Sequence, residues 1–217
     1  MASDGPGLIL MERGTVEGQS SGPAPRRGRI LSDEARIAFA PAETYCELLA
    51  HDGQVGWRRA LARPAFVILL IGTLASIAAT GRVSFSLVAS TAIAWSFAVV
   101  LQLALGAILV ASAPARRPSL PRALHLWFAG HLPWSLWFLV ATAIVRLLPS
   151  APLWPILAST LLAIAWTGAI AAAFCRTVLG ATRPGSWLRA ATQQALMVGL
   201  VLSYLAWAAG GWFRLMP

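Results

Sequence analysis

The chain has 217 residues, of which 58% are hydrophobic and only 12% are charged. Soluble domains carry about 25% charged residues, so this composition predicts an integral membrane protein. The formal net charge of +9 is unevenly spread: residues 1–52 hold five arginines and eight acidic residues, whereas residues 53–217 hold twelve arginines and no acidic residue. These arginines lie singly or in small groups between apolar runs, which is typical of membrane topology signals and argues against nucleic-acid binding.

The first segment, residues 1–32, contains Gly, Ser, Pro and scattered charges without apolar periodicity. We expect it to be a disordered cytoplasmic tail. Its start lacks the basic region and the long apolar run of a cleaved signal peptide, so the first spanning helix is expected to direct insertion.

Residues 33–63 are predicted to form a short amphipathic interfacial helix followed by a basic turn. Pro41 offers a helix start at a first-turn position, and Tyr45, Leu48 and Leu49 share one helical face. The segment is too short and too charged to cross a bilayer. We therefore expect it to lie on the membrane surface or against the helix bundle.

Residues 64–217 are predicted to form a transmembrane domain of five helices, which makes the expected fold all-α and polytopic. A proline at position 133 is expected to break the third helix. The predicted spans are Pro64–Thr80, Leu87–Ser112, Leu126–Leu148, Leu153–Cys175 and Ala195–Trp212.

Loop arginines predict the orientation of these spans. Five spans place fourteen arginines on the side of the N-terminus and only Arg82, Arg146 and Arg214 on the other side. By the positive-inside rule the N-terminus is expected in the cytoplasm and the C-terminus on the periplasmic side. Arginine used without lysine, together with abundant Ala and Gly, suggests a GC-rich bacterial genome and hence a bacterial inner membrane.

Small residues recur four apart in three of the predicted spans, and such pairs allow close helix contacts in lipid. The pairs are Gly72 with Ser76, Gly168 with Ala172, and Ala206 with Gly210.

The candidate functional positions are polar or aromatic residues within the predicted spans, namely His131, Gln102, Pro133 and Trp134. Polar groups inside a membrane are often functional, so a ligand or proton-relay role is one interpretation. The other is structural: an aromatic belt, a packed kink and a hydrogen bond from Gln102 across the bundle. We expect no metal site, because His125 and His131 are six residues apart and no carboxylate accompanies them. No catalytic motif occurs in a supporting context, so we expect neither enzyme activity nor a cofactor.

The order of these parts resembles the Yip1 domain family over about residues 37–213. The resemblance lies in Pro41 followed by Tyr45 four residues later, in Arg63-Pro64, and in five spans with the C-terminus outside. It implies a non-enzymatic membrane scaffold or adaptor with protein partners. The acidic cytoplasmic patch associated with partner binding in that family would correspond to Asp33, Glu34, Glu43 and Glu47.

Two functions therefore follow from the sequence. The first is a Yip1-type scaffold, whose bundle should enclose no polar cavity. The alternative is a small transporter, channel or transporter subunit, with a path near His131 and Gln102. The expected partners are the lipid bilayer and proteins of unknown identity, and the sequence leaves open whether the chain forms a homo-oligomer.

Overall fold

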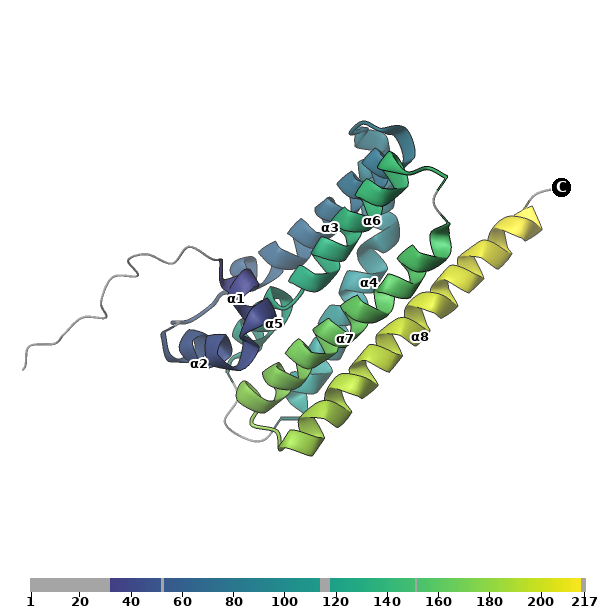
Figure 1. Ribbon diagram of the computed structural model, residues 1–217. Coiled ribbons are helices and arrows are strands. Elements are labelled where there is room, and N and C mark those ends of the chain that lie inside the picture. The colour runs from purple at the N-terminus through teal and green to yellow at the C-terminus, as the bar shows by residue number, and fades with distance from the viewer. Residues whose placement is uncertain (1–31, 52, 114–117, 151, 216–217) are drawn as a thin grey trace, which may run out of the picture. The chain divides into compact units, whose positions relative to one another are not determined.

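The computed structural model describes residues 32–51, 53–113, 118–150 and 152–215, with the side chains at 51, 205 and 208–215 outside the description. All regular structure in these ranges is helical (Figure 1). The helices are α1 (Asp33–Phe39), α2 (Pro41–His51), α3 (Trp57–Thr80), α4 (Phe85–Ala111), α5 (Leu120–Ala129), α6 (Leu132–Leu147), α7 (Leu153–Thr177) and α8 (Arg183–Leu215).

Two short helices, α1 and α2, precede the long ones. The Ser32 side chain accepts a hydrogen bond from the backbone N–H of Ala35 and so caps α1, as expected for serine at a helix start. Helix α1 ends with Ala40 as its C-cap, and Pro41 begins α2. Of the predicted tail, only Ser32 belongs to the described residues.

The apolar face of α2 packs against the other helices, as the sequence allowed. Tyr45 is fully buried and Leu48 nearly so, and Leu49 packs against the same core. Helix α2 lies against α7, and α1 lies against α5, α6 and α7. Burial of a side chain the size of Tyr or Leu is worth about 1.5–3 kcal/mol, so this face fixes the helix pair to the bundle.

Arginine side chains add polar ties between α1, α2 and the bundle. Arg63 Nη1 donates to the His125 carbonyl oxygen at 2.8 Å, and its Nη2 lies 2.7 Å from Glu34 Oε1. Arg122 Nη2 donates to the carbonyl oxygens of Leu48 and Leu49 at 3.1 and 2.8 Å. Two of the last four carbonyls of α2, which have no partner within their own helix, are thereby satisfied.

The long helices form a ring in which each contacts its neighbours, in the order α3, α4, α8, α7, α6 and back to α3. Helices α3 and α4 are antiparallel neighbours, as are α7 and α8 (Figure 1). Helices α3 and α4 approach closely at Gly72, where an added Cβ would meet the Val88 carbonyl oxygen at 2.6 Å. Ser76 is also fully buried, so the predicted contact role of this small-residue pair is confirmed.

Helix α5 fills one end of the ring. Every residue from Ala123 to His131 is buried, so this stretch lies in the interior of the bundle. It contacts α3 and α4 as well as α1. Arg189 Nη2 of α8 donates to the Ser112 carbonyl oxygen at the end of α4 at 3.4 Å, so these two helix ends also lie at this end of the ring.

Four helices of the described residues are long and apolar enough to cross a membrane: α3, α4, α5 with α6 taken together, and α7. The expectation of an all-α membrane protein is confirmed to that extent. The fifth span, predicted at Ala195–Trp212, lies in the 33-residue α8 and stays a prediction, as does the interfacial position of α2.

Helix boundaries differ from the sequence expectation at several places, among them the start of α3 and the break in the third span. The segment from Trp57 to Arg63, expected to be a basic turn, forms the first turns of α3, because arginine stems can lie along a helix while their charged heads reach water. The break in the third span falls at Gly130 and His131, just before Pro133. Pro133 lies in the first turn of α6, where its missing N–H costs nothing. The helix is therefore interrupted before the proline and not at it.

Candidate ligand-binding cavity

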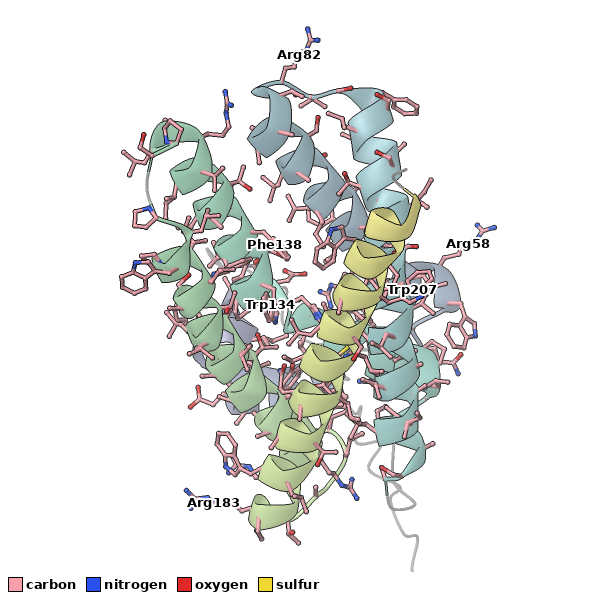
Figure 2. All side chains as sticks on the ribbon, turned by 90° about the vertical axis from the view of Figure 1, so that its right-hand side faces the viewer. Arg58, Arg82, Trp134, Phe138, Arg183 and Trp207 are labelled. Carbon is pink, nitrogen blue, oxygen red and sulfur yellow. The ribbon has the colours of Figure 1, made fainter. Side chains whose placement is uncertain are left out.

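The helix ring surrounds a cavity of about 410 Å³, within the range of small-molecule sites. All five long helices of the ring contribute to its wall, and Trp127 of α5 lies at its closed end. Apolar and aromatic side chains make up most of the surface, among them Trp134 and Phe138 of α6, which face the ring interior beside α8 (Figure 2).

A histidine–glutamine pair bridges two helices at the cavity wall. His131 Nε2 lies 2.8 Å from Gln102 Oε1 of α4, so the ring N–H donates to the amide oxygen. The His131 ring also stacks on Phe128, with centroids 4.7 Å apart. The pair holds the α5–α6 break against α4, and the hydrogen bond that we expected Gln102 to make across the bundle is confirmed.

Other polar side chains of the wall lie at the same depth as this pair. Gln102 is nine residues before the end of α4, Thr167 ten before the end of α7, and Gln193 ten after the start of α8. At 1.5 Å per residue these positions lie about 14–15 Å from the helix ends that surround α5. One polar layer is therefore formed by four residues: Gln102, His131, Thr167 and Gln193.

The polar layer contains buried atoms without a hydrogen-bond partner in the described structure. Gln193 is only 5% exposed, and its Oε1 has no hydrogen-bond partner among the described residues. A buried acceptor left unsatisfied costs about 1–3 kcal/mol. Trp127 Nε1 and His131 Nδ1, which also belong to wall residues, are likewise buried without a hydrogen bond in the described part of the chain.

Aromatic rings dominate the wall beyond the polar layer. Phe138 contacts three tryptophans, with centroid distances of 6.2 Å to Trp95, 6.2 Å to Trp134 and 5.1 Å to Trp137. Trp137 Nε1 donates to Ser159 Oγ at 2.9 Å, which ties α6 to α7. Such ring pairs add about 0.5–1.5 kcal/mol each beyond their buried area, so this part of the wall is rigid.

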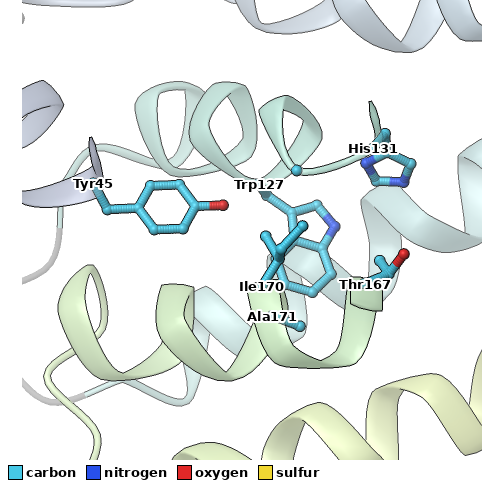
Figure 3. A pocket seen from close by; sticks show the side chains of 7 residues that line it. Tyr45, Trp127, His131, Thr167, Ile170 and Ala171 are labelled. Carbon is cyan, nitrogen blue, oxygen red and sulfur yellow. The ribbon is translucent and has the colours of Figure 1, made fainter. Parts of the chain in front are cut away.

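A second, much smaller void of about 10 Å³ separates the cavity from α2. Figure 3 shows Tyr45 on one side of it and His131 with Thr167 on the other. Its size is close to that of one water molecule. Burial raises the pKa of Tyr45 above its ordinary value, so its hydroxyl stays protonated and donates to the Leu126 carbonyl oxygen at 3.5 Å. The void therefore lies between Tyr45 of α2 and two residues of the polar layer, His131 and Thr167.

The cavity wall is made of apolar and neutral polar side chains. The residues that line the cavity in the described structure include no Asp, Glu, Lys, Arg or Cys. The described residues also contain no cluster of three or more His, Cys, Asp or Glu side chains suited to a metal ion. What the wall offers a ligand is apolar area and neutral hydrogen-bonding groups.

The structure brings three of the four sequence candidates to this wall: His131, Gln102 and Trp134. Pro133 is buried in the first turn of α6 and is absent from the cavity lining, so its contribution is to shape the break. Gln193 and Gln194 were not among the predicted site residues, because the fifth span was predicted to begin at Ala195 and both were therefore assigned to a loop. Their signal was a pair of polar residues at the edge of an apolar run.

Comparison of the chain with protein-family models, with curated proteins and with solved structures finds no match.

Proposed function

We propose that this chain is a non-enzymatic multi-pass protein of a bacterial inner membrane, and that it binds an apolar or amphiphilic molecule taken from the bilayer. The observation that carries the proposal is the cavity lined by the five helices of the ring, with its uncharged wall. This function corresponds to the small transporter or transporter subunit expected near His131 and Gln102, with a membrane-soluble substrate.

Ions and hydrophilic solutes fit this wall poorly. Sites for such cargo replace water with charged side chains or rings of carbonyls, whereas this wall is uncharged and mostly apolar. Transfer of a hydrocarbon chain from lipid to such a wall costs little free energy, because both surroundings are apolar. Contact with the aromatic rings of the wall favours binding of the chain.

A matched pair of substitutions on α4 tests this proposal. Ala98 is buried and lines the cavity, whereas Val100, two residues later and so on the opposite side of the helix, is exposed and does not line it. Membranes containing the full chain would be irradiated with a diazirine-bearing oleyl alcohol, and labelled peptides quantified by mass spectrometry. Ala98→Trp fills the cavity and should lower labelling of the cavity-lining peptides at least fivefold, while Val100→Trp should leave it unchanged. Equal labelling in the wild-type protein and Ala98→Trp would overturn the proposal.

A five-span topology belongs to the same proposal. It is supported by the apolar run Ala195–Trp212 within α8 and by the antiparallel contact of α8 with α7. The N-terminus then lies in the cytoplasm and the C-terminus in the periplasm, which agrees with the distribution of arginines.

A Yip1-type scaffold is the second candidate function. It is favoured by the firm attachment of α1 and α2, which presents Glu43 and other acidic side chains at a fixed position. A scaffold of this kind should lose specific protein partners at least fivefold when residues 1–30 are deleted, as measured by quantitative mass spectrometry after cross-linking in membranes. An unchanged partner set in the deletion variant, with the protein still folded, would exclude the tail as the docking element.

A further inference from the structure

We infer that the cavity is a binding site for a neutral amphiphile, with the uncharged headgroup at the polar layer and the hydrocarbon chain along the aromatic wall. This inference rests on the proposed function and specifies the class of ligand. A long-chain alcohol or primary amide has the required chemistry.

The headgroup position follows from the unsatisfied Gln193 oxygen. Gln193 is 5% exposed, lines the cavity and keeps Oε1 without a partner in the described structure. A hydroxyl or amide N–H would satisfy this acceptor. Thr167 Oγ1 already donates to the Ala163 carbonyl at 2.7 Å, so its remaining lone pairs can only accept a hydrogen bond. The polar layer thus calls for a headgroup that donates.

The headgroup must also be uncharged. The residues that line the described cavity include no Asp, Glu, Lys or Arg, and His131 Nε2 is engaged with Gln102. A sulfate or quaternary ammonium group would enter an apolar cavity without a counter-ion, which is strongly unfavourable. A headgroup of neutral donors avoids this cost.

The chain direction follows from the positions of the remaining wall residues. Leu202 lies nine residues beyond Gln193 on α8 and also lines the cavity, which corresponds to about 14 Å of helix. Trp95 and Leu157 line the same region and lie farther than the polar layer from the α5 end. At that end Trp127 and the buried helix α5 close the cavity. The hydrocarbon chain therefore extends away from α5.

Competition against the oleyl alcohol photoprobe tests the headgroup, with ligands of one chain length. Unlabelled oleyl alcohol and oleamide should halve labelling at a certain concentration. The concentrations of octadecene, oleyl sulfate or oleyltrimethylammonium needed for the same effect should be at least tenfold higher. Gln193→Leu removes the free acceptor and should reduce the preference for oleyl alcohol over octadecene at least threefold. Thr192→Leu, on the exposed side of α8, is the matched control and should retain the full preference.

The outcomes separate the inference from the proposed function. Equal competition by oleyl alcohol and octadecene, or stronger competition by a charged ligand, would overturn the inference even where Ala98→Trp abolishes labelling. An unaltered preference in Gln193→Leu would also overturn it. Labelling that Ala98→Trp leaves intact would remove the proposed function itself.

Discussion

Gly72 shows how a single small residue sets the distance between two helices. Any side chain there would meet a backbone atom, because a Cβ would lie 2.6 Å from the Val88 carbonyl oxygen. A Cβ added to Gly199 of α8 would have no atom within 4 Å, so this glycine provides a matched control. Gly72→Ala should destabilise the protein by about 1–3 kcal/mol through overpacking. Gly199→Ala should be neutral or stabilising by up to about 1 kcal/mol.

The apparent melting temperature of the purified protein in detergent measures both effects. A Gly72→Ala variant as stable as the wild-type protein would mean that α3 and α4 are farther apart than described.

Tyr45 contributes mainly through its ring. The hydroxyl makes one long hydrogen bond of 3.5 Å, whereas the fully buried ring packs edge-on against Phe174 at 5.7 Å. Tyr45→Phe should therefore cost only about 0.5–1.5 kcal/mol. Tyr45→Ala should cost about 3–5 kcal/mol, and apparent melting temperatures should rank the variants in that order. The reverse ranking would place the polar contact above the packing.

Residues of the candidate site were predictable to different degrees. Gln102 and His131 stood out because each interrupts an apolar run, and a polar group inside a membrane needs a partner. The sequence could not show that the two are partners, since they lie 29 positions apart and meet only through the packing of α4 on the α5–α6 break. Gln193 was missed because its own helix begins twelve residues earlier than the apolar run suggested.

Helix α1 offers an element whose attachment depends on pH. Burial pushes the pKa of Glu34 upward, but the hydrogen bond to its own backbone N–H and the charge of Arg63 outweigh burial, and the pKa ends below its ordinary value. A carboxylate with a lowered pKa stabilises the folded arrangement above its ordinary pKa near 4.5, and that stabilisation is lost as the pH falls through the lowered value. Acid should therefore loosen α1.

Hydrogen–deuterium exchange of α1, corrected for the intrinsic effect of pH, measures this loosening. Exchange should rise below the ordinary glutamate range in the wild-type protein. Glu34→Gln should show a smaller rise, with some dependence left because Glu47 pairs with Arg36 at 2.6 Å. Glu43→Gln, at an exposed position, should behave as the wild-type protein does. An identical acid profile in Glu34→Gln would exclude this ion pair as the cause.

Helix existence was easier to predict than helix ends. Each apolar run of the sequence is helical in the structure, the third being divided between α5 and α6, but α3 starts seven residues before its predicted span and α8 twelve before its own. Hydropathy reports only the part of a helix that suits hydrocarbon. Arginines at the ends are tolerated because their stems lie along the helix and their heads reach water, so the helix continues past the apolar run.

The orientation of the whole bundle can be tested in cells. Arg82 and Arg183 lie at opposite ends of the bundle (Figure 2), and the proposed topology places the first in the periplasm. In a background of Cys46→Ser and Cys175→Ala, Val83→Cys should react with a membrane-impermeant maleimide added outside the inner membrane. Thr182→Cys should react only after permeabilisation. Alkaline phosphatase fused to the C-terminus should be active. Labelling of both cysteines from one side, or an inactive fusion, would contradict five spans.

The sequence by itself determined that this is a helical membrane protein, because a chain without acidic residues over residues 53–217 and with long apolar runs is suited to lipid. It also determined the amphipathic face of α2, since the spacing of Tyr45, Leu48 and Leu49 fixes which side is buried. Only the tertiary structure decided that α5 closes one end of a five-helix ring and that side chains from four separate segments form one polar layer. Periodicity specifies which face of a helix is apolar but not which helix will cover it, and a cavity exists only where several such faces fail to meet.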